Sequence, residues 1–239
     1  MSNRLHHATF VQSTSLARDT TLYLFSLDEK IHFRPGQFIS VQVGIDADNN
    51  PILRSYSLAF TPNEGLIALV IKLIGCGVGT RYFSTLKRGS QISFTGPMGF
   101  FVNELFHMGD VVYAATGTGL APIYPMIVET LKRKEQGKVY LFWGLRSKED
   151  LFFQEELSIL QGENERFSAT ICFSQEQKHK LSWGKHGRIQ APILELLPHL
   201  HKPVIYLCGN GQMINEVKQL LQEKGLDRKR QIRTESFFD

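Results

Sequence analysis

Cysteine is scarce in this sequence, and the positions of the few that occur exclude several kinds of site. The 239 residues contain three, Cys76, Cys172 and Cys208. Three cysteines so far apart cannot form a disulfide framework, a CxxC-type zinc site or a four-cysteine iron–sulfur cluster. We therefore expect a reduced, cytoplasmic protein that has no metal site of its own.

Long apolar runs and an excess of charge of one sign are also missing. No stretch approaches the roughly 18 apolar residues of a membrane span, and residues 1–11 lack the apolar centre of a secretory signal. The 27 Lys and Arg residues exceed the 23 Asp and Glu residues only slightly, and residues 1–105 and 106–239 share that surplus equally. We expect no membrane span, no nucleic-acid partner and a monomer.

The first part of the chain has the pattern of an antiparallel β-barrel. Within residues 1–105, short runs of β-branched and aromatic residues are separated by turn signals. The expected strands are 20–27, 37–43, 54–60, 66–73 and 91–95, and one helix is expected at 80–87.

Beyond residue 105 the pattern changes to strands that alternate with helices. The expected strands are 110–115, 138–143, 167–173 and 203–208, and the expected helices are 121–134, 150–160 and 212–223. Such alternation predicts an α/β domain with a doubly wound parallel sheet. The chain thus divides into two predicted domains, 1–105 and 106–239.

Three glycine-rich stretches follow predicted strands, where backbone amides can contact a phosphate. The stretch Thr116-Gly117-Thr118-Gly119-Leu120-Ala121-Pro122 opens a predicted helix, and a helix start of this kind attracts a pyrophosphate. A turn that needs glycine for its geometry explains it equally well. The other two stretches are Gly75-Cys76-Gly77-Val78-Gly79-Thr80 and Cys208-Gly209-Asn210-Gly211-Gln212-Met213. Cys208 is also compatible with a small buried side chain.

A fourth motif, Arg54-Ser55-Tyr56-Ser57, lies on a predicted barrel strand. An arginine can bind a phosphate as a fork, a tyrosine offers a flat stacking face, and a serine can hydrogen-bond a ring nitrogen. An ordinary amphipathic strand would give the same pattern. The chain ends in Glu235-Ser236-Phe237-Phe238-Asp239, whose aromatic residues would either fray or cover a core.

The order and spacing of these motifs resemble the ferredoxin–NADP(+) reductase superfamily over nearly the whole chain. The R-x-Y-S signature of that family is matched by Arg54, Tyr56 and Ser57, and its G-x-x-S/T motif by Gly77-Val78-Gly79-Thr80. The nicotinamide loop G-T-G-x-A-P is matched by residues 117–122. Further matches are Gly96-Pro97-Met98-Gly99-Phe100-Phe101, Cys208 with Gly209 and Met213, and Glu235 with Phe237.

The resemblance implies a flavin-dependent oxidoreductase that moves hydride between NADP(H) and FAD and exchanges single electrons with ferredoxin or flavodoxin. It implies that Arg54 holds the FAD pyrophosphate and Tyr56 stacks on the flavin, which Phe237 or Phe238 covers. The implied catalytic residues are Ser57, Cys208 and Glu235. The other implied cofactor-binding residues are Ser55, Gly77, Val78, Gly79, Thr80, Thr116, Gly117, Thr118, Gly119, Ala121, Pro122, Gly209 and Met213. Two alternatives stay open: an NAD(P)H-dependent flavin reductase or oxygenase reductase component, and a nucleotide-binding regulator without enzymatic activity.

The choice of coenzyme depends on residues near the adenosine ribose. Arg146 and Ser147 follow the second strand of the nucleotide domain, where that ribose is expected, and Ser174 follows the third. A guanidinium there favours the 2′-phosphate of NADP. NAD stays possible, because Gln175 stands where many NADP-using members of the family have an arginine.

Overall fold

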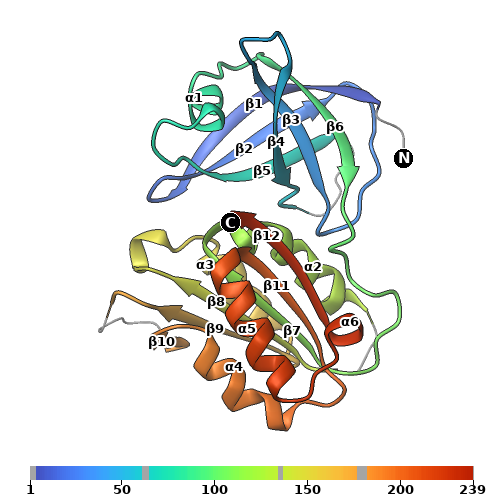
Figure 1. Cartoon of the computed structure of the whole chain (residues 1–239), viewed down its shortest axis with the longest axis vertical. Helices are drawn as coiled ribbons and strands as arrows, with labels where there is room; N and C mark the ends of the chain where they lie inside the picture. The colour runs from blue at the N-terminus through green and yellow to red at the C-terminus, as the bar shows by residue number, and fades with distance from the viewer. Residues whose placement is uncertain (1–3, 61–64, 134–136, 177–181, 239) are drawn as a thin grey trace.

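The computed structural model describes residues 4–60, 65–133, 137–176 and 182–238, with only the backbone of Phe238, and these form two domains (Figure 1). The first is a six-stranded antiparallel sheet with the order β4-β3-β6-β1-β2-β5. A bridge between Leu58, directly after β4, and Leu69, in the middle of β5, closes the sheet into a barrel. Its strands are β1 (Leu5–Ala17), β2 (Thr20–Leu27), β3 (Phe38–Ile45), β4 (Pro51–Ser57), β5 (Leu66–Lys72) and β6 (Gln91–Met98), and α1 (Val78–Ser84) packs on the barrel.

Alternation of side chains explains the barrel core. Ile39, Val41 and Val43 of β3 are buried, whereas the residues between them are only partly covered. The first strand, β1, buries only Ala8 and Phe10 among thirteen residues, and its remaining positions are mostly polar. Because of this composition β1 contains no apolar run, and the sequence analysis did not predict the strand.

The second domain is a six-stranded parallel sheet with the order β10-β9-β8-β7-β11-β12, as a doubly wound fold requires. Its strands are β7 (Val111–Thr116), β8 (Val139–Leu145), β9 (Phe167–Phe173), β10 (Gly184–His186), β11 (Val204–Asn210) and β12 (Ile232–Phe238). Its helices are α2 (Leu120–Lys132), α3 (Gln154–Glu163), α4 (Gln190–Leu196), α5 (Gly211–Glu223) and α6 (Arg228–Gln231), with short 3₁₀ turns η1 (Gly117–Gly119), η2 (Lys148–Asp150) and η3 (Leu197–His199).

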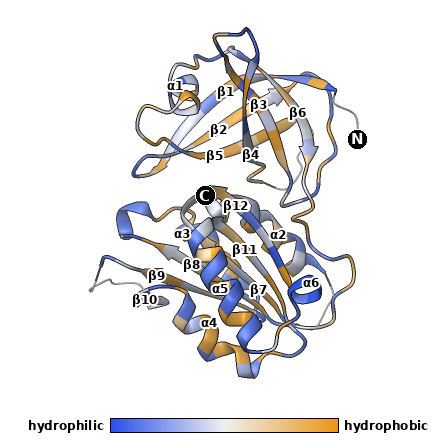
Figure 2. Ribbon diagram, viewed as in Figure 1, coloured by the Kyte–Doolittle hydropathy of each residue, from blue (hydrophilic) through white to orange (hydrophobic). Residues whose placement is uncertain are grey.

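The helices cover both faces of this sheet. Helices α2 and α3 pack on the face that also meets the barrel, and α4 and α5 pack on the other. Figure 2 shows the strands mostly hydrophobic and the outer faces of the helices hydrophilic. Among the described residues, no helix combines the length and the apolar composition that crossing a membrane would need.

One apolar cluster joins the two domains. Ala59, Val70 and Phe101 come from the barrel side and lie in the same core as residues of α2, β7 and β8. At a second contact, the ring centroids of Phe60 and Phe153 are 5.9 Å apart. The domains are therefore packed against each other rather than tethered by a flexible linker.

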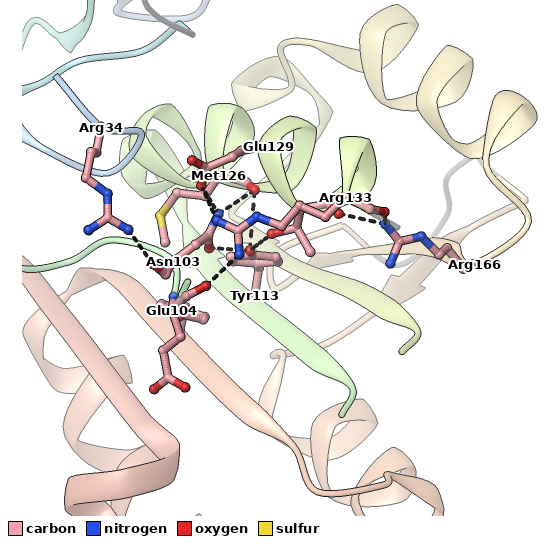
Figure 3. Close-up of polar contacts among 10 residues, drawn as sticks. Arg34, Asn103, Glu104, Tyr113, Met126, Glu129, Arg133 and Arg166 are labelled. Atoms are coloured by element: carbon pink, nitrogen blue, oxygen red, sulfur yellow. Dashed lines mark hydrogen bonds and ion pairs between the residues drawn. The ribbon is translucent and has the colours of Figure 1, made fainter. Parts of the chain in front are cut away.

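A buried polar network holds the connecting segment in place (Figure 3). Asn103 is its centre: the side-chain amide donates to the Met126 carbonyl at 2.9 Å and accepts from the Tyr113 hydroxyl at 2.6 Å. Arg34 of the barrel donates to the Asn103 carbonyl at 2.6 Å. Arg133, at the end of α2, donates to the carbonyl of Glu104. This network fixes how the barrel faces the nucleotide domain, and so positions the site between them.

Candidate active site

On the barrel, β4 and α1 approach each other closely. Arg54 and Tyr56 are two residues apart on β4 and therefore point to the same side of the strand. A Cβ added to Gly79 would lie 2.5 Å from the Tyr56 hydroxyl and 4.0 Å from Cγ of Arg54. The Tyr56 ring also packs edge-on against Phe83, with ring centroids 4.9 Å apart. A larger residue at position 79 would push the Tyr56 hydroxyl aside.

The first turn of α1 offers backbone amides to an anion. Its first hydrogen bond runs from the Arg81 N–H to the Gly77 carbonyl at 3.0 Å, so the N–H groups of residues 78–80 have no partner within the helix. The Thr80 hydroxyl closes the preceding loop, because it accepts from the Ile74 N–H at 3.0 Å and lies 3.2 Å from the Ile74 carbonyl, to which it donates. Thr80 thus shapes the loop while its amide stays available.

This set of donors fits the pyrophosphate of FAD. The Arg54 side chain is exposed beside those amides, and its guanidinium donates to the Leu53 carbonyl at 2.8 Å. A fork of this kind together with helix amides is suited to phosphate oxygens. Burial raises the pKa of Tyr56 to about 12, so its hydroxyl stays protonated. Ser57 is buried at the end of β4, and Ser55 is exposed on the other side of the strand.

Arg54→Ala should weaken binding of the flavin by about 2–3 kcal/mol, or roughly 30- to 150-fold, because a charged hydrogen bond to phosphate is lost. Titration of flavin-free protein with FAD, followed by flavin fluorescence, measures the change. Arg4→Ala is a matched control, because Arg4 pairs with Glu29 on the exposed barrel surface. An unchanged affinity in Arg54→Ala would remove Arg54 from the flavin site.

The carboxyl ends of β7 and β11 meet where the strand order reverses, and their two glycine loops interlock there. A Cβ on Gly119 would lie 2.4 Å from the Cys208 carbonyl oxygen, and one on Gly209 would lie 2.4 Å from Oγ1 of Thr116. The Thr116 hydroxyl accepts a hydrogen bond from the Asn210 N–H at 2.9 Å. Doubly wound sheets bind ligands at this kind of switch point.

Cys208 and Glu235 are paired neighbours on β11 and β12 and therefore share one side of the sheet. Cys208 is fully buried, and burial followed by the charge of Glu235 raises the pKa of its thiol well above the usual value. Burial also raises the pKa of Glu235 to about 7. The pair therefore presents a neutral thiol and a carboxyl that can hold a proton near neutral pH. Ser57, the third residue predicted to be catalytic, lies in the barrel.

A cleft of about 860 Å³ opens along this edge of the sheet and reaches the barrel. Its wall contains nine of the predicted residues: Thr116, Gly117, Thr118, Arg146, Ser147, Ser174, Gly209, Met213 and Phe237. Gly119, Ala121 and Pro122 lie buried at the start of α2 instead, where they support the loop from below. The side chain of Phe238 lies outside the part of the chain that the structure describes.

The three residues predicted near the ribose differ in whether their side chains bond to other parts of the protein. The Ser174 hydroxyl donates to the Leu145 carbonyl at 3.3 Å. Ser147 forms a capping box with Asp150, in which each side chain accepts from the backbone N–H of the other. The Arg146 guanidinium is exposed and makes no ion pair within the described ranges. Arg146 is therefore the free cation of this group.

The sequence motifs did not include several polar residues of the cleft wall. Arg188 comes from the loop before α4, Gln190 is the first residue of α4, and Glu216 comes from α5. From the barrel, Lys72 pairs with Asp150 at 3.4 Å across the domain boundary. In the sequence around Arg188, the only sign of a special backbone position is the preceding glycine, which has a φ of +106°. The positions of Gln190, Glu216 and Lys72 follow from the topology of the fold.

Comparisons with known proteins agree with this arrangement. Residues 7–102 match the model of an oxidoreductase FAD-binding domain, and residues 114–219 match that of an oxidoreductase NAD-binding domain. The two matches correspond to the barrel and to the parallel sheet. The chain therefore has an FAD-binding domain and a domain for a nicotinamide dinucleotide.

Individual relatives cover most of the chain. It is 27% identical over 206 residues to a ferredoxin–NADP reductase B of Sorangium cellulosum, covering 82% of each protein. It is 26% identical over 234 residues to the glycine betaine monooxygenase reductase subunit of Pseudomonas aeruginosa, and this match covers 96% of the chain but 63% of that subunit. Among solved structures, the cytochrome P450 reductase GcoB of Amycolatopsis superimposes with a TM-score of 0.88 at 26% identity, over 99% of this chain and 70% of that one.

Proposed function

We propose that this chain, which belongs to the ferredoxin–NADP(+) reductase superfamily, moves hydride between NADP(H) and FAD and exchanges single electrons with ferredoxin or flavodoxin. That it is an FAD- and NAD(P)-binding oxidoreductase follows from its two domains. Arg146 carries the choice of NADP, because its guanidinium, which makes no ion pair among the described residues, lies in the cleft wall where the 2′-phosphate is expected. The likeness to the Sorangium reductase supports a ferredoxin-type partner.

The barrel residues would bind and orient the flavin. We assign Arg54 and the amides of residues 78–80 to its pyrophosphate and the ring of Tyr56 to its flat face. Ser57 would hydrogen-bond the ring system. FAD, when bound, supplies the redox chemistry, since a flavin takes up two electrons as one hydride and releases them one at a time.

The nucleotide-domain residues would bring the nicotinamide to that ring. The loop residues Thr116, Gly117 and Thr118 approach the coenzyme with their backbone, because they line the cleft at the switch point. We assign Cys208 and Glu235 to the nicotinamide end of the site, although neither lines the cleft itself; Phe237, two residues after Glu235, does. Close packing of two ordered rings is what hydride transfer needs from the protein.

We also propose a division into domains 1–105 and 106–239 and a cytoplasmic location. Strand β6 ends at Met98 and β7 begins at Val111, so the boundary falls in the segment between them. The three cysteines are free, which fits a reducing compartment.

One set of measurements tests the function. Flavin released by heat should be FAD, and steady-state rates should give a KM for NADPH at least about tenfold below that for NADH. Reduction of cytochrome c should become fast only when ferredoxin or flavodoxin is added. Release of FMN, or a preference for NADH, would overturn the corresponding part of the proposal.

The second candidate is a reductase component of an oxygenase system. It is favoured by the match of 96% of the chain to a monooxygenase reductase subunit, of which the chain spans 63%. Equal rates of cytochrome c or free-flavin reduction with and without a small carrier would favour this candidate. A colourless protein that takes up no flavin would instead favour a nucleotide-binding regulator.

A further inference from the structure

Glu216 of α5 gathers three side chains of the cleft wall around its carboxylate. Its Oε2 accepts from Nε2 of Gln190 at 2.6 Å, and its Oε1 accepts from Nε2 of Gln212 at 2.8 Å. Nη1 of Arg188 lies 3.6 Å from the same Oε2. All four residues line the cleft. The carboxylate therefore sits on the surface that a dinucleotide must cross.

Gln190 has one amide atom bound to Glu216 and one that is not. Because its Nε2 is bound to a carboxylate, the amide cannot turn round, and its Oε1 is directed elsewhere. That oxygen is buried and has no hydrogen-bond partner among the residues that the structure describes. A buried acceptor without a donor is costly. A hydroxyl or amino group of an adenosine moiety in the cleft would supply the donor.

The cleft thus contains two guanidinium groups in different states. Arg146 is free of ion pairs within the described residues, whereas Arg188 is held by Glu216. A phosphate that approaches Arg188 has to share it with a carboxylate and meets the negative charge of Glu216 as well. A free ribose hydroxyl meets no such repulsion. Glu216 should therefore weaken the binding of NADP more than the binding of NAD.

We propose that Glu216 is a specificity-determining residue: by neutralising Arg188 it limits the affinity of the cleft for the 2′-phosphate, and Arg146 alone supplies most of the preference for NADP. This inference rests on the proposed function, because it takes the cleft to be the site of the coenzyme. The inference adds that the preference for NADP over NAD is smaller than two guanidinium groups without ion pairs would give. Glu216 acts through Arg188 and has no part in hydride transfer.

Binding of two small probes tests the inference without turnover. Adenosine 2′,5′-bisphosphate carries the 2′-phosphate and 5′-AMP lacks it, and calorimetry on the FAD-loaded protein gives both affinities. Glu216→Gln should tighten the bisphosphate about three- to fivefold, since an exposed ion pair contributes up to about 1 kcal/mol. It should change the affinity for 5′-AMP by less than about twofold. Glu223→Gln is the matched control, because Glu223 is exposed on the same helix and bonds only to Gln219 at 3.0 Å among the described residues.

A second pair of variants tests the route through Arg188. In an Arg188→Ala background, Glu216→Gln should tighten the bisphosphate clearly less than in the parent, because only the direct repulsion of the phosphate is then relieved. In an Arg146→Ala background its effect should be undiminished. Persistence of the full effect without Arg188 would overturn the inference, as would weaker binding of the bisphosphate in Glu216→Gln alone. If the parent protein binds neither probe, the cleft is not the coenzyme site and the proposed function fails too. If it binds both and Glu216→Gln leaves their ratio unchanged, only the role of Glu216 falls.

Discussion

Gly209→Ala should lower the free energy of unfolding by about 3 kcal/mol or more and prevent binding of the nicotinamide coenzyme. Two causes act together. Gly209 has a φ of +124°, a conformation that side chains other than glycine rarely adopt. A Cβ would also lie 2.4 Å from Oγ1 and 2.6 Å from the carbonyl oxygen of Thr116. Backbone atoms of a parallel sheet cannot give way at that distance without separating β7 from β11.

Urea unfolding and titration with NADPH measure the two effects of Gly209→Ala separately. Gly162→Ala is the matched control, because Gly162 lies in α3 and an added Cβ there would meet no atom within 4 Å. Alanine in a helix should stabilise the protein by about 0.5–1 kcal/mol. A Gly209→Ala protein of parental stability would mean that the two loops do not interlock as closely as their glycines indicate.

Strands with a strong local signal were predicted well. The predicted ranges 20–27 and 167–173 coincide with β2 and β9, because both are apolar runs between turn signals. Strands that depend on their neighbours were missed: β10 has three residues and β12 is the edge strand beside β11. The predicted fold class is confirmed, because alternation of strands and helices is a property of the whole chain.

The candidate site likewise contains motifs with a local sequence signal and contacts that depend on the fold. Motifs contained in one short segment, such as Thr116 to Gly119 or Arg54 to Ser57, could be proposed from sequence because their geometry is local. Arg188 and Glu216 lie 28 residues apart in sequence, and only the packing of α5 beside the start of α4 makes them neighbours. Contacts across the domain boundary, such as Lys72 with Asp150, have no local signature at all.

Glu235 should make the protein less stable as the pH rises from about 4.5 to about 7. Burial raises its pKa in the folded state to about 7 from an ordinary value of 4.5. Between these values the unfolded chain has released the proton and the folded chain still holds it, so unfolding becomes more favourable with each step in pH. The stabilisation is complete below pH 4.5. It is lost by the time the pH has passed through about 7, and remains lost above that value.

Glu235→Gln should remove this pH dependence, because a glutamine stays neutral at every pH. At 1.36 kcal/mol per pKa unit, the stability of the variant relative to the parent should rise by up to about 3 kcal/mol between pH 4.5 and pH 8, less whatever the partial exposure of Glu235 screens. Urea midpoints of both proteins across this range give the difference, in which all other titrating groups cancel. A difference that does not change with pH would mean that Glu235 ionises in the folded protein at its ordinary pKa of 4.5 and is charged at neutral pH. The nicotinamide would then meet a full negative charge beside Cys208 rather than a protonated carboxyl, and the assignment of neutral groups to the nicotinamide end of the site would have to be withdrawn.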